Sequence, residues 1–413
     1  MKMRKSPARA KNCAGGIITT IITAAYFFAP PYFLNGKDFK CAEFKGKSGA
    51  VFGQIPIVCA DELPREKNKN EFVVQTEKGV YKYFYPQIKG LLSGEKTLLG
   101  FENEVERIYA DNFVAPINAQ LVFNAEKSNP FEIIPEKSGK EIKKEQISAA
   151  IGYALASGKN FVKLKTESVS PEISALDLRK KCVLRSVFST YYGNSSFERK
   201  NNVYLAASAI SGTRLKSGES FSFNEVVGER SEERGYKKAK IIVSGEFVEG
   251  VGGGVCQVST TVYNAALKAG LTVTEWHRHS LPVSYVSPSF DAMVSGTFCD
   301  LVFKNDSGSD IFIVCRADGE NLTVKFYGIK SEYEYKLVPV ITEVIKAETV
   351  EEYDESLAAG EYKEIVRAHD GLKSEGYMCV YKKGKLVCNR KLRTDEYAAR
   401  KGLVKKGAKK VDN

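Results

Sequence analysis

Residues 252–261 read GGGVCQVSTT, a glycine run that leads through Cys256 into a segment with the apolar spacing of a helix. Shortly after it, residues 277–280 read HRHS and hold two of the three histidines of the chain. A thiol at the start of a helix, with imidazoles near it in sequence, supplies the groups of nucleophilic catalysis. The same groups can form a metal site or be ordinary core residues, so the surrounding sequence has to separate these cases.

The length and composition indicate a folded protein of several domains. A chain of 413 residues is too long for one ordinary core, and about two to four domains are expected. Hydrophobic residues make up 43% and charged residues 27%, as in folded proteins. The net charge of +11 is spread along the chain, without a nucleic-acid-binding motif. We therefore expect anionic polymers or lipid head groups as partners of the basic surface, and no nucleic acid.

The N-terminus predicts a membrane anchor. Residues 1–11 carry five basic side chains, and residues 12–36 form an uncharged stretch whose length suffices to span a bilayer as a helix. The basic flank predicts that residues 1–36 are a cytoplasmic tail and a transmembrane helix, with the remainder of the chain exported. A cleaved signal peptide is the alternative, but the sequence after the apolar run lacks a cleavage site of small residues.

Cysteine usage favours an oxidising, extracellular compartment. Outside the anchor, eight of the nine cysteines remain, and six of them flank short segments rich in turn-forming residues. Cross-strand cysteines in register can meet disulfide geometry. We therefore expect three disulfides within hairpins, Cys41–Cys59, Cys299–Cys315 and Cys379–Cys388. The remaining Cys182 and Cys256 either pair with each other or leave Cys256 as a free thiol.

The pattern of helices and strands divides the exported residues into three units. Residues 37–178 and 179–330 each mix strand-like and helical segments, which predicts two α+β domains. Residues 331–413 are rich in strand patterns and predict a small all-β domain, commonly a binding or spacer module. The fold class is therefore α+β with a small all-β domain. The predicted helices are 144–157, 201–211 and 259–269, and the predicted strands include 72–75, 118–123, 292–298, 311–315 and 322–327.

Cys256 is the candidate nucleophile. Free backbone N–H groups at a helix start stabilise negative charge, which lowers the pKa of a thiol placed there. We expect the same N–H groups, or the side-chain amide of Gln257, to hold an oxyanion. His279 is the candidate base, and Asp291 is the candidate for orienting its imidazole, as the third group of a triad. The glycines before Cys256 allow a substrate to approach the backbone closely.

Other interpretations of these residues stay open. Cys256 can be a small buried residue behind a tightly packed glycine loop, or can be bonded to Cys182. A metal site would use Cys256, His277 and His279, but no fourth ligand is evident. A phosphate loop is excluded because no Lys-Ser/Thr follows the glycines, so we predict neither a metal nor another cofactor. Trp276, the only tryptophan, is either a stacking platform for a sugar or a core anchor.

Several motifs resemble the VanW family. They are residues 221–230 (FSFNEVVGER), 235–236 (GY), 252–263, 277–280, 283–285 (VSY) and 291–292 (DA), and they extend the resemblance over residues 179–328. Residues 131–139 and 144–158 are similar to a peptidoglycan-binding domain often found upstream of this family. The C-terminal unit is similar to a G-five domain, a strand-rich module named for its glycines, through Gly360, Gly371, Gly376 and Gly384.

The resemblance implies a bacterial cell-envelope protein that binds peptidoglycan or another cell-wall polymer. The family takes its name from a gene that accompanies vancomycin resistance. This link to antibiotic resistance indicates a location at the cell wall more than it indicates a particular reaction. The residues at family motif positions are Cys256, Gln257, Ser259, Thr260, Tyr263, His279 and Asp291. The expected ligand-binding residues are Gly253, Gly254, Ser259, Thr260, Tyr263, Trp276 and His277.

Two functions follow from these observations. The first is a membrane-anchored, extracytoplasmic Cys–His hydrolase or transferase that binds and remodels peptidoglycan. The second is a non-catalytic wall-binding or adhesion scaffold, which the strand-rich C-terminal unit favours. A cleft that joins Cys256 to His279 would argue for the first function, and burial of the two groups in separate cores would argue for the second.

Overall fold

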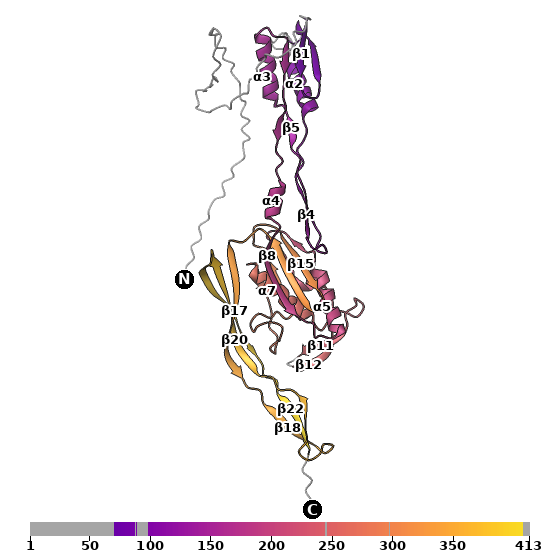
Figure 1. Cartoon of the computed structure of the whole chain (residues 1–413), viewed down its shortest axis with the longest axis vertical. Coiled ribbons are helices and arrows are strands. Elements are labelled where there is room, and N and C mark those ends of the chain that lie inside the picture. Colours follow the sequence, from indigo (N-terminus) through magenta and orange to yellow (C-terminus); the bar gives the residue numbers. More distant parts are fainter. Residues whose placement is uncertain (1–69, 87, 89–97, 244–245, 297, 408–413) are drawn as a thin grey trace, which may run out of the picture. The chain divides into compact units, whose positions relative to one another are not determined.

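The computed structural model describes residues 70–86, 88, 98–243, 246–296 and 298–407. These residues form a mixed α+β structure that ends in a small all-β region, which confirms the predicted fold class for this part of the chain (Figure 1). The predicted anchor at residues 1–36 lies outside the described residues, as do Cys41 and Cys59. None of the described helices is long and apolar enough to cross a membrane.

The N-terminal part, residues 70–180, packs two helices against a three-stranded sheet. Its elements are β1 (Glu71–Gln75), β2 (Val80–Phe84), α2 (Leu98–Asn112), β3 (Gln120–Phe123), β4 (Phe131–Ile134), β5 (Gly139–Glu141), α3 (Lys144–Ala156), β6 (Phe161–Lys163), β7 (Glu167–Val169) and α4 (Ala175–Lys180). Strand β1 lies between β2, which is antiparallel to it, and β6, which is parallel. Phe72 of β1, Ile108 of α2 and Ile147 of α3 meet in one buried cluster. Helix α3 coincides with the helix predicted at 144–157. Helix α2 was not predicted, although Phe101, Val105 and Ile108 recur at the spacing of one helix face.

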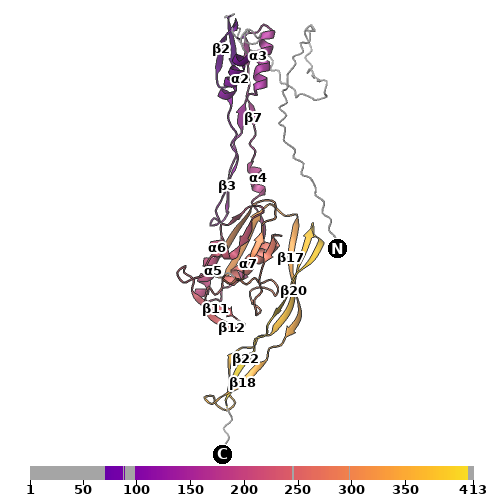
Figure 2. The same ribbon diagram turned by 180° about the vertical axis from the view of Figure 1, so that it is seen from behind.

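The central part, residues 183–328, packs α5 and α7 against a four-stranded antiparallel sheet. Its elements are β8 (Val183–Tyr191), α5 (Phe197–Ile210), β9 (Arg214–Leu215), β10 (Ser220–Ser222), α6 (Phe223–Val227), β11 (Lys238–Val243), β12 (Glu246–Val251), α7 (Val255–Lys268), β13 (Thr272–Glu275), β14 (Val302–Lys304), β15 (Ile311–Ala317) and β16 (Asn321–Gly328). The sheet has the order β8-β16-β15-β9, and a smaller sheet has the order β10-β14-β13. Helix α7 packs on β8 and β16, α5 packs on β15, and the two helices contact each other (Figures 1 and 2).

Helix α7 is almost completely buried, with one exception. Gly254 forms its N-cap at a φ of 109°, a left-handed conformation that favours glycine. Between Val255 and Leu267 every side chain is buried except that of Cys256, which is half-buried. The fold therefore presents a single side chain of this stretch, the thiol, at the start of the helix.

An irregular segment, residues 276–301, covers one side of α7. The sequence predicts a strand at 292–298, and the structure has none among residues 292–296 and 298, which it describes. Hydroxyl groups of α7 bind the backbone instead, since Thr260 accepts from the Ala292 N–H at 2.9 Å and Ser259 donates to the Ala292 carbonyl at 2.5 Å. These bonds occupy backbone groups that a strand would have offered to a neighbouring strand.

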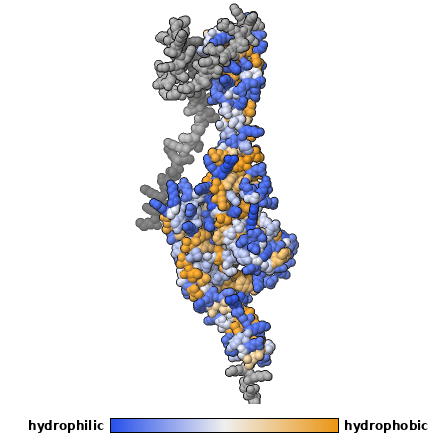
Figure 3. Space-filling view, viewed as in Figure 1, coloured by the Kyte–Doolittle hydropathy of each residue, from blue (hydrophilic) through white to orange (hydrophobic). Residues whose placement is uncertain are grey.

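The C-terminal part, residues 333–407, consists of two three-stranded sheets. Its elements are β17 (Tyr333–Ile345), β18 (Thr349–Asp354), β19 (Tyr362–Val366), β20 (Gly371–Lys382), β21 (Lys385–Tyr397) and β22 (Gly402–Gly407). Strand β20 lies between β17 and β21, and β22 lies between β18 and β19. Many side chains are exposed, including the apolar Val338, Val340, Ile341 and Val344 of β17. Figure 3 shows apolar surface interspersed with hydrophilic surface over the described residues. In β21 burial is confined to Arg393, Asp395 and Tyr397, where this strand meets the central part.

The structure does not contain the disulfide predicted within the β20–β21 hairpin. All six cysteines that the structure describes are free. Cys379 lies opposite Asn389 in the ladder, and Cys388 lies opposite Val380. Because neighbouring strand residues point to opposite faces, this offset of one residue places the two thiols on different sides of the sheet.

The predicted Cys299–Cys315 pair is also wrong, and of the two alternatives left open for Cys182 and Cys256 the structure has the unbonded one. Cys315 is buried in β15, which pairs with β16 and β9 and not with the segment that holds Cys299. The Cys182 thiol donates a hydrogen bond to the Leu178 carbonyl at 3.2 Å and is not bonded to Cys256. Cys256 is therefore a free thiol.

A substitution at Gly254 tests how tightly the start of α7 is packed. A Cβ atom added there would lie 2.9 Å from Arg199 Cγ and 3.1 Å from Val203 Cγ2, in addition to the backbone strain. We expect Gly254→Ala to lower the free energy of unfolding by about 2–5 kcal/mol, the sum of left-handed strain and overpacking. Gly308→Ala is the matched control, because Gly308 has a φ of 78° and no atom within 4 Å of the added Cβ. Urea unfolding should show a smaller loss of about 1–2 kcal/mol there, and equal losses would contradict the crowding at Gly254.

Candidate functional site

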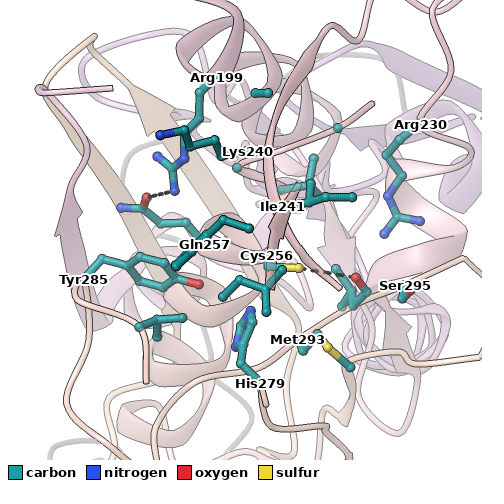
Figure 4. Close-up of a pocket in the computed structure, with 18 of the residues that line it drawn as sticks. Arg199, Arg230, Lys240, Ile241, Cys256, Gln257, His279, Tyr285, Met293 and Ser295 are labelled. Carbon is teal, nitrogen blue, oxygen red and sulfur yellow. Dashed lines mark hydrogen bonds between the residues drawn. The ribbon is translucent and has the colours of Figure 1, made fainter. Parts of the chain in front are cut away.

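A large cleft opens beside the start of α7 (Figure 4). Its walls come from the start of α5, the β11–β12 hairpin, the first turn of α7 and the segment 276–301. The cleft measures about 2240 Å³, whereas pockets for small molecules commonly measure about 300–1,000 Å³. Its size therefore suits a segment of an extended polymer better than a small metabolite. Cys256 and His279 both line it.

Cys256 occupies the second position of α7, where backbone N–H groups have no helical acceptor. Its thiol donates to the carbonyl oxygen of Val294 at 3.3 Å, and the imidazole of His279 is near enough to act on its ionisation. Figure 4 shows the ring of His279 directed at the sulfur. The cleft therefore joins the thiol to the imidazole, which is the arrangement that the catalytic hypothesis requires.

Asp291 binds His279 at two points. Its Oδ2 atom accepts hydrogen bonds from the backbone N–H and from Nδ1 of His279, both at 2.7 Å. Because Nδ1 faces the carboxylate, Nε2 is the nitrogen that faces the sulfur. The His279 side chain is 5% exposed and that of Asp291 is 1% exposed, so packing fixes the ring. Cys256, His279 and Asp291 thus lie in the order of a catalytic triad.

The electrostatics of this group favour an ion pair between thiolate and imidazolium. Burial alone would raise the pKa of the Cys256 thiol, but the hydrogen bond and the positive charge of His279 lower it below its ordinary value. Burial alone would lower the pKa of His279, but its bonds with Asp291 and Cys256 raise it to about 9. The imidazolium therefore favours the thiolate, the nucleophilic form of the sulfur, with the proton on Nε2.

Two residues of β21 that the sequence did not single out bind the other side of Asp291. Arg393 Nη2 lies 3.2 Å from Asp291 Oδ1, and Arg393 Nη1 donates to the Asp291 carbonyl at 2.7 Å. The Tyr397 hydroxyl donates to Oδ1 at 2.6 Å. Burial alone would raise the pKa of Asp291, but the bond with His279 and these contacts hold it below its ordinary value. His279 and the C-terminal part therefore together keep the third member of the triad ionised.

Gln257 does not take the predicted oxyanion role. Its Nε2 donates to Thr190 Oγ1 and to the Tyr191 carbonyl, both at 3.0 Å, and its Oε1 accepts from Arg199 at 2.8 Å. The side-chain amide is therefore fully engaged and fastens α7 to β8 and α5. The backbone N–H of Cys256 is the better oxyanion donor, because it has no acceptor among the described residues.

Most of the predicted ligand-binding residues of α7 have structural contacts. The hydroxyls of Ser259 and Thr260 bind the backbone of Ala292, as described above. Tyr263 is fully buried and its hydroxyl contacts Arg393. These polar side chains hold the segment 276–301 and β21 in place, so none of them faces the cleft as a ligand contact.

The two predicted glycine contacts differ in position. Gly254 lines the cleft, whereas Gly253 does not. A Cβ atom on Gly253 would lie 2.8 Å from backbone atoms of Ala239 and Lys240. Gly253 is therefore required for close packing of α7 against β11.

The contacts of His277 and Trp276 also indicate structural roles. His277 Nε2 lies 3.0 Å from Glu275 Oε1. The guanidinium of Arg393 lies 4.5 Å from the centre of the Trp276 ring, so the tryptophan supports the cation that binds Asp291. The residues described contain no group of three or more His, Cys, Asp or Glu side chains that could hold a metal ion.

Known proteins match two parts of this chain. Residues 198–327 match the family described as "VanW like protein", and residues 338–409 match the G5 domain. The chain is 35% identical over 214 residues to the uncharacterized protein YoaR of Bacillus subtilis (strain 168), which covers 51% of this chain and 69% of YoaR. It is 28% identical over 151 residues to the vancomycin B-type resistance protein VanW of Enterococcus faecalis (strain ATCC 700802 / V583), with coverage of 34% and 55%.

Two solved structures of G5 domains also match. The G5 domain of IgA1 protease has 22% sequence identity and a TM-score of 0.15, and covers 19% of this chain and 92% of that one. The structure of HP0197-G5 has 25% identity and a TM-score of 0.13, and covers 19% of this chain and all of that one.

The ion pair predicts selective labelling of Cys256 by iodoacetamide at a pH of about 6.5, where ordinary thiols are protonated. The pKa of Cys256 is lowered, whereas burial raises that of Cys182 to about 11 and that of Cys315 to about 12. Peptide mapping by mass spectrometry should find Cys256 as the first modified site. His279→Ala should slow its labelling by about tenfold or more, since each pKa unit is a factor of ten in thiolate.

His277→Ala is the matched control for that experiment. His277 lies two residues away and pairs with Glu275, so its removal should leave the labelling rate unchanged. Similar rates in both histidine variants would show that His279 does not activate the thiol.

The bonds between Asp291 and β21 predict that the stability of the fold depends strongly on Arg393. Arg393→Met leaves the buried carboxylates of Asp291 and Asp395 without their cation. We expect a loss of about 3–5 kcal/mol in the free energy of unfolding. Lys391→Met on the same strand removes only a partly exposed ion pair with Glu375, and should cost about 0–1 kcal/mol. Urea unfolding of both variants measures the difference, and a small loss at Arg393 would exclude this support of the triad.

Proposed function

Because the chain belongs to the VanW-like protein family, we propose that it is a bacterial cell-wall protein whose central part transfers acyl groups on wall peptides. The observation that carries the proposal is the line Cys256–His279–Asp291 at a helix start in a large cleft. A thiolate held by an imidazolium, which a carboxylate orients, is the arrangement of nucleophilic acyl transfer.

The first half of the reaction forms a thioester. The Cys256 thiolate attacks the carbonyl carbon of a peptide bond, and the N–H of Cys256 donates to the oxyanion that develops. The His279 imidazolium then gives its Nε2 proton to the nitrogen of the leaving amine, and the C–N bond breaks. Asp291 holds the ring with Nε2 toward the sulfur through both steps.

The second half regenerates the thiolate. Water, or the amine of a second peptide, attacks the thioester carbonyl while neutral His279 accepts its proton at Nε2. The C–S bond breaks and Cys256 leaves as the thiolate. Water as acceptor gives hydrolysis, and an amine gives a new peptide bond. The hydrolase and the transferase therefore share one site and differ only in the acceptor.

Three features support a wall polymer as the substrate. One relative carries vancomycin resistance in its name, and that antibiotic resistance concerns the bacterial wall. The cleft of about 2240 Å³ has room for an extended chain. The net charge of +11 favours anionic polymers of the envelope. We assign the hold on peptidoglycan to the N-terminal part and to the C-terminal G5 domain.

The predicted tail and anchor, residues 1–36, complete the proposal. An uncleaved helix there, with basic residues on its cytoplasmic side, leaves the rest of the chain outside the membrane. The thiol of Cys256 would then lie in the compartment that holds the wall.

A non-catalytic wall-binding scaffold is the second candidate. The G5 match and the exposed sheets of the C-terminal part favour it. A scaffold gives no reason, however, for a single activated thiol to face the cleft from an otherwise buried helix. We therefore place acyl transfer first.

An assay with purified sacculi distinguishes the acyl-transfer enzyme from the scaffold. We expect the full-length protein in detergent to sediment with sacculi and to change their muropeptides, as read by liquid chromatography and mass spectrometry. Cys256→Ala should abolish the new products and keep the sedimentation, because the thioester cannot form. Cys388→Ala, at an exposed thiol outside the cleft, should retain both. Sedimentation without any thiol-dependent product would instead establish the scaffold.

The proposed orientation predicts which part of the chain a protease can reach. Protease added to intact cells, stripped of their wall, should degrade residues 333–407, because they lie on the outer side of the membrane. A cytoplasmic protein in the same sample should survive until the cells are permeabilised. Survival of residues 333–407 together with that protein would overturn the orientation.

A further inference from the structure

Two arginines flank the thiol in the cleft. Arg199 belongs to α5 and Arg230 to the segment after α6, and Figure 4 shows their side chains on either side of Cys256. The charge of each guanidinium acts on the sulfur. The triad alone does not require these two cations, so they indicate a further property of the site.

Among the described residues, neither arginine forms an ion pair with a carboxylate. Arg199 donates to Ser195 Oγ and to Gln257 Oε1, both at 2.8 Å. Arg230 Nη2 donates to Asn224 Oδ1 at 2.5 Å. All of these acceptors are neutral. A guanidinium carries five N–H donors, so Arg230 keeps several of them for another partner.

The reaction changes the charge around these arginines. Burial lowers the pKa of both, because each guanidinium has given up part of its water. The negative charge of the Cys256 thiolate acts on both arginines, and that of Asp300 acts on Arg230 as well. When the sulfur becomes a thioester, that negative charge disappears. The cleft then holds two cations whose shared counter-charge has been consumed, and an anion on the substrate would restore the balance.

We propose that Arg230, assisted by Arg199, binds a carboxylate of the peptide substrate beside the carbonyl that Cys256 attacks. The proposal rests on the function proposed above and narrows its substrates to peptides with a free carboxylate close to the scissile bond. A guanidinium holds a carboxylate through two parallel N–H···O bonds, which fix direction as well as distance. Such a contact would place the carbonyl carbon over the sulfur.

Arg230 is a better position than Arg199 for a substitution that tests the carboxylate contact. Arg199 also holds the amide of Gln257 at the start of α7, so its replacement would disturb the helix that carries the thiol. Arg230 donates to a single described acceptor, on Asn224. Lys240 lines the same cleft as an exposed cation and serves as the matched control for general positive charge (Figure 4).

Iodoacetate and iodoacetamide test the carboxylate contact, because both alkylate a thiolate and only the first carries a carboxylate. Their rates at Cys256 of the full-length protein are measured by peptide mapping, and the rate ratio is divided by the ratio for glutathione. The fraction of Cys256 present as thiolate affects both rates equally, so it does not affect their ratio. We expect a preference for iodoacetate of about tenfold or more, the size of a charge-assisted hydrogen bond. Arg230→Gln should remove this preference, and Lys240→Gln should change it by less than about twofold.

The outcomes separate this proposal from the proposed function. Rapid alkylation by iodoacetamide with no preference for iodoacetate would overturn the carboxylate site and leave the acyl transfer intact. Slow alkylation by both reagents at a pH of about 6.5 would overturn the nucleophile itself. A preference that Arg230→Gln leaves unchanged, or that Lys240→Gln removes equally, would exclude Arg230 as the carboxylate partner.

Discussion

The carboxylate of Asp291 is the group on which the arrangement of the site depends. A buried carboxylate is costly unless it is paired and hydrogen-bonded, and this one is bound by His279 on one side and by Arg393 and Tyr397 on the other. The partners come from two different parts of the chain. The segment 276–301 cannot move away from β21 without taking Arg393 and Tyr397 from that charge, so the position of the imidazole depends on the C-terminal sheet.

The site also requires the polar side of α7. Ser259 and Thr260 bind the backbone of the irregular segment 276–301, and Gln257 fastens the helix to β8 and α5. These bonds keep buried polar groups satisfied and fix the distance from the helix to His279. Cys256 alone remains half-buried at the helix start. A rigid support with one uncommitted nucleophile is what positioning in acyl transfer requires.

The sequence predicted the parts of this arrangement that depend on local order. The glycine run, the helix and the order of Cys256, His279 and Asp291 along the chain were sufficient for the triad hypothesis, which the sequence left open against a buried or bonded cysteine. The polar residues of the same motif were assigned to ligands because a sequence does not show whether a hydroxyl faces a cleft or a backbone. Arg393 was missed because its contact with Asp291 depends on how β21 packs, and the only local signal was the alternation of buried polar residues along that strand. The Cys379–Cys388 disulfide was predicted wrongly for a similar reason, since an offset of one residue in a ladder changes which face a thiol takes.

The dependence of Asp291 on β21 changes how the two candidate functions relate to each other. The sequence suggested a strand-rich module that binds or separates, attached to a domain that reacts. In the structure, Arg393 and Tyr397 of that module hold the carboxylate that orients the imidazole, and Trp276 of the central part packs on Arg393. A ligand that shifts β21 would therefore act on the ionisation of Asp291 and on the ring of His279. The proposed wall binding by the C-terminal part and the proposed chemistry at Cys256 would for this reason be coupled, and a C-terminal part that binds the wall would be no evidence against an active central part.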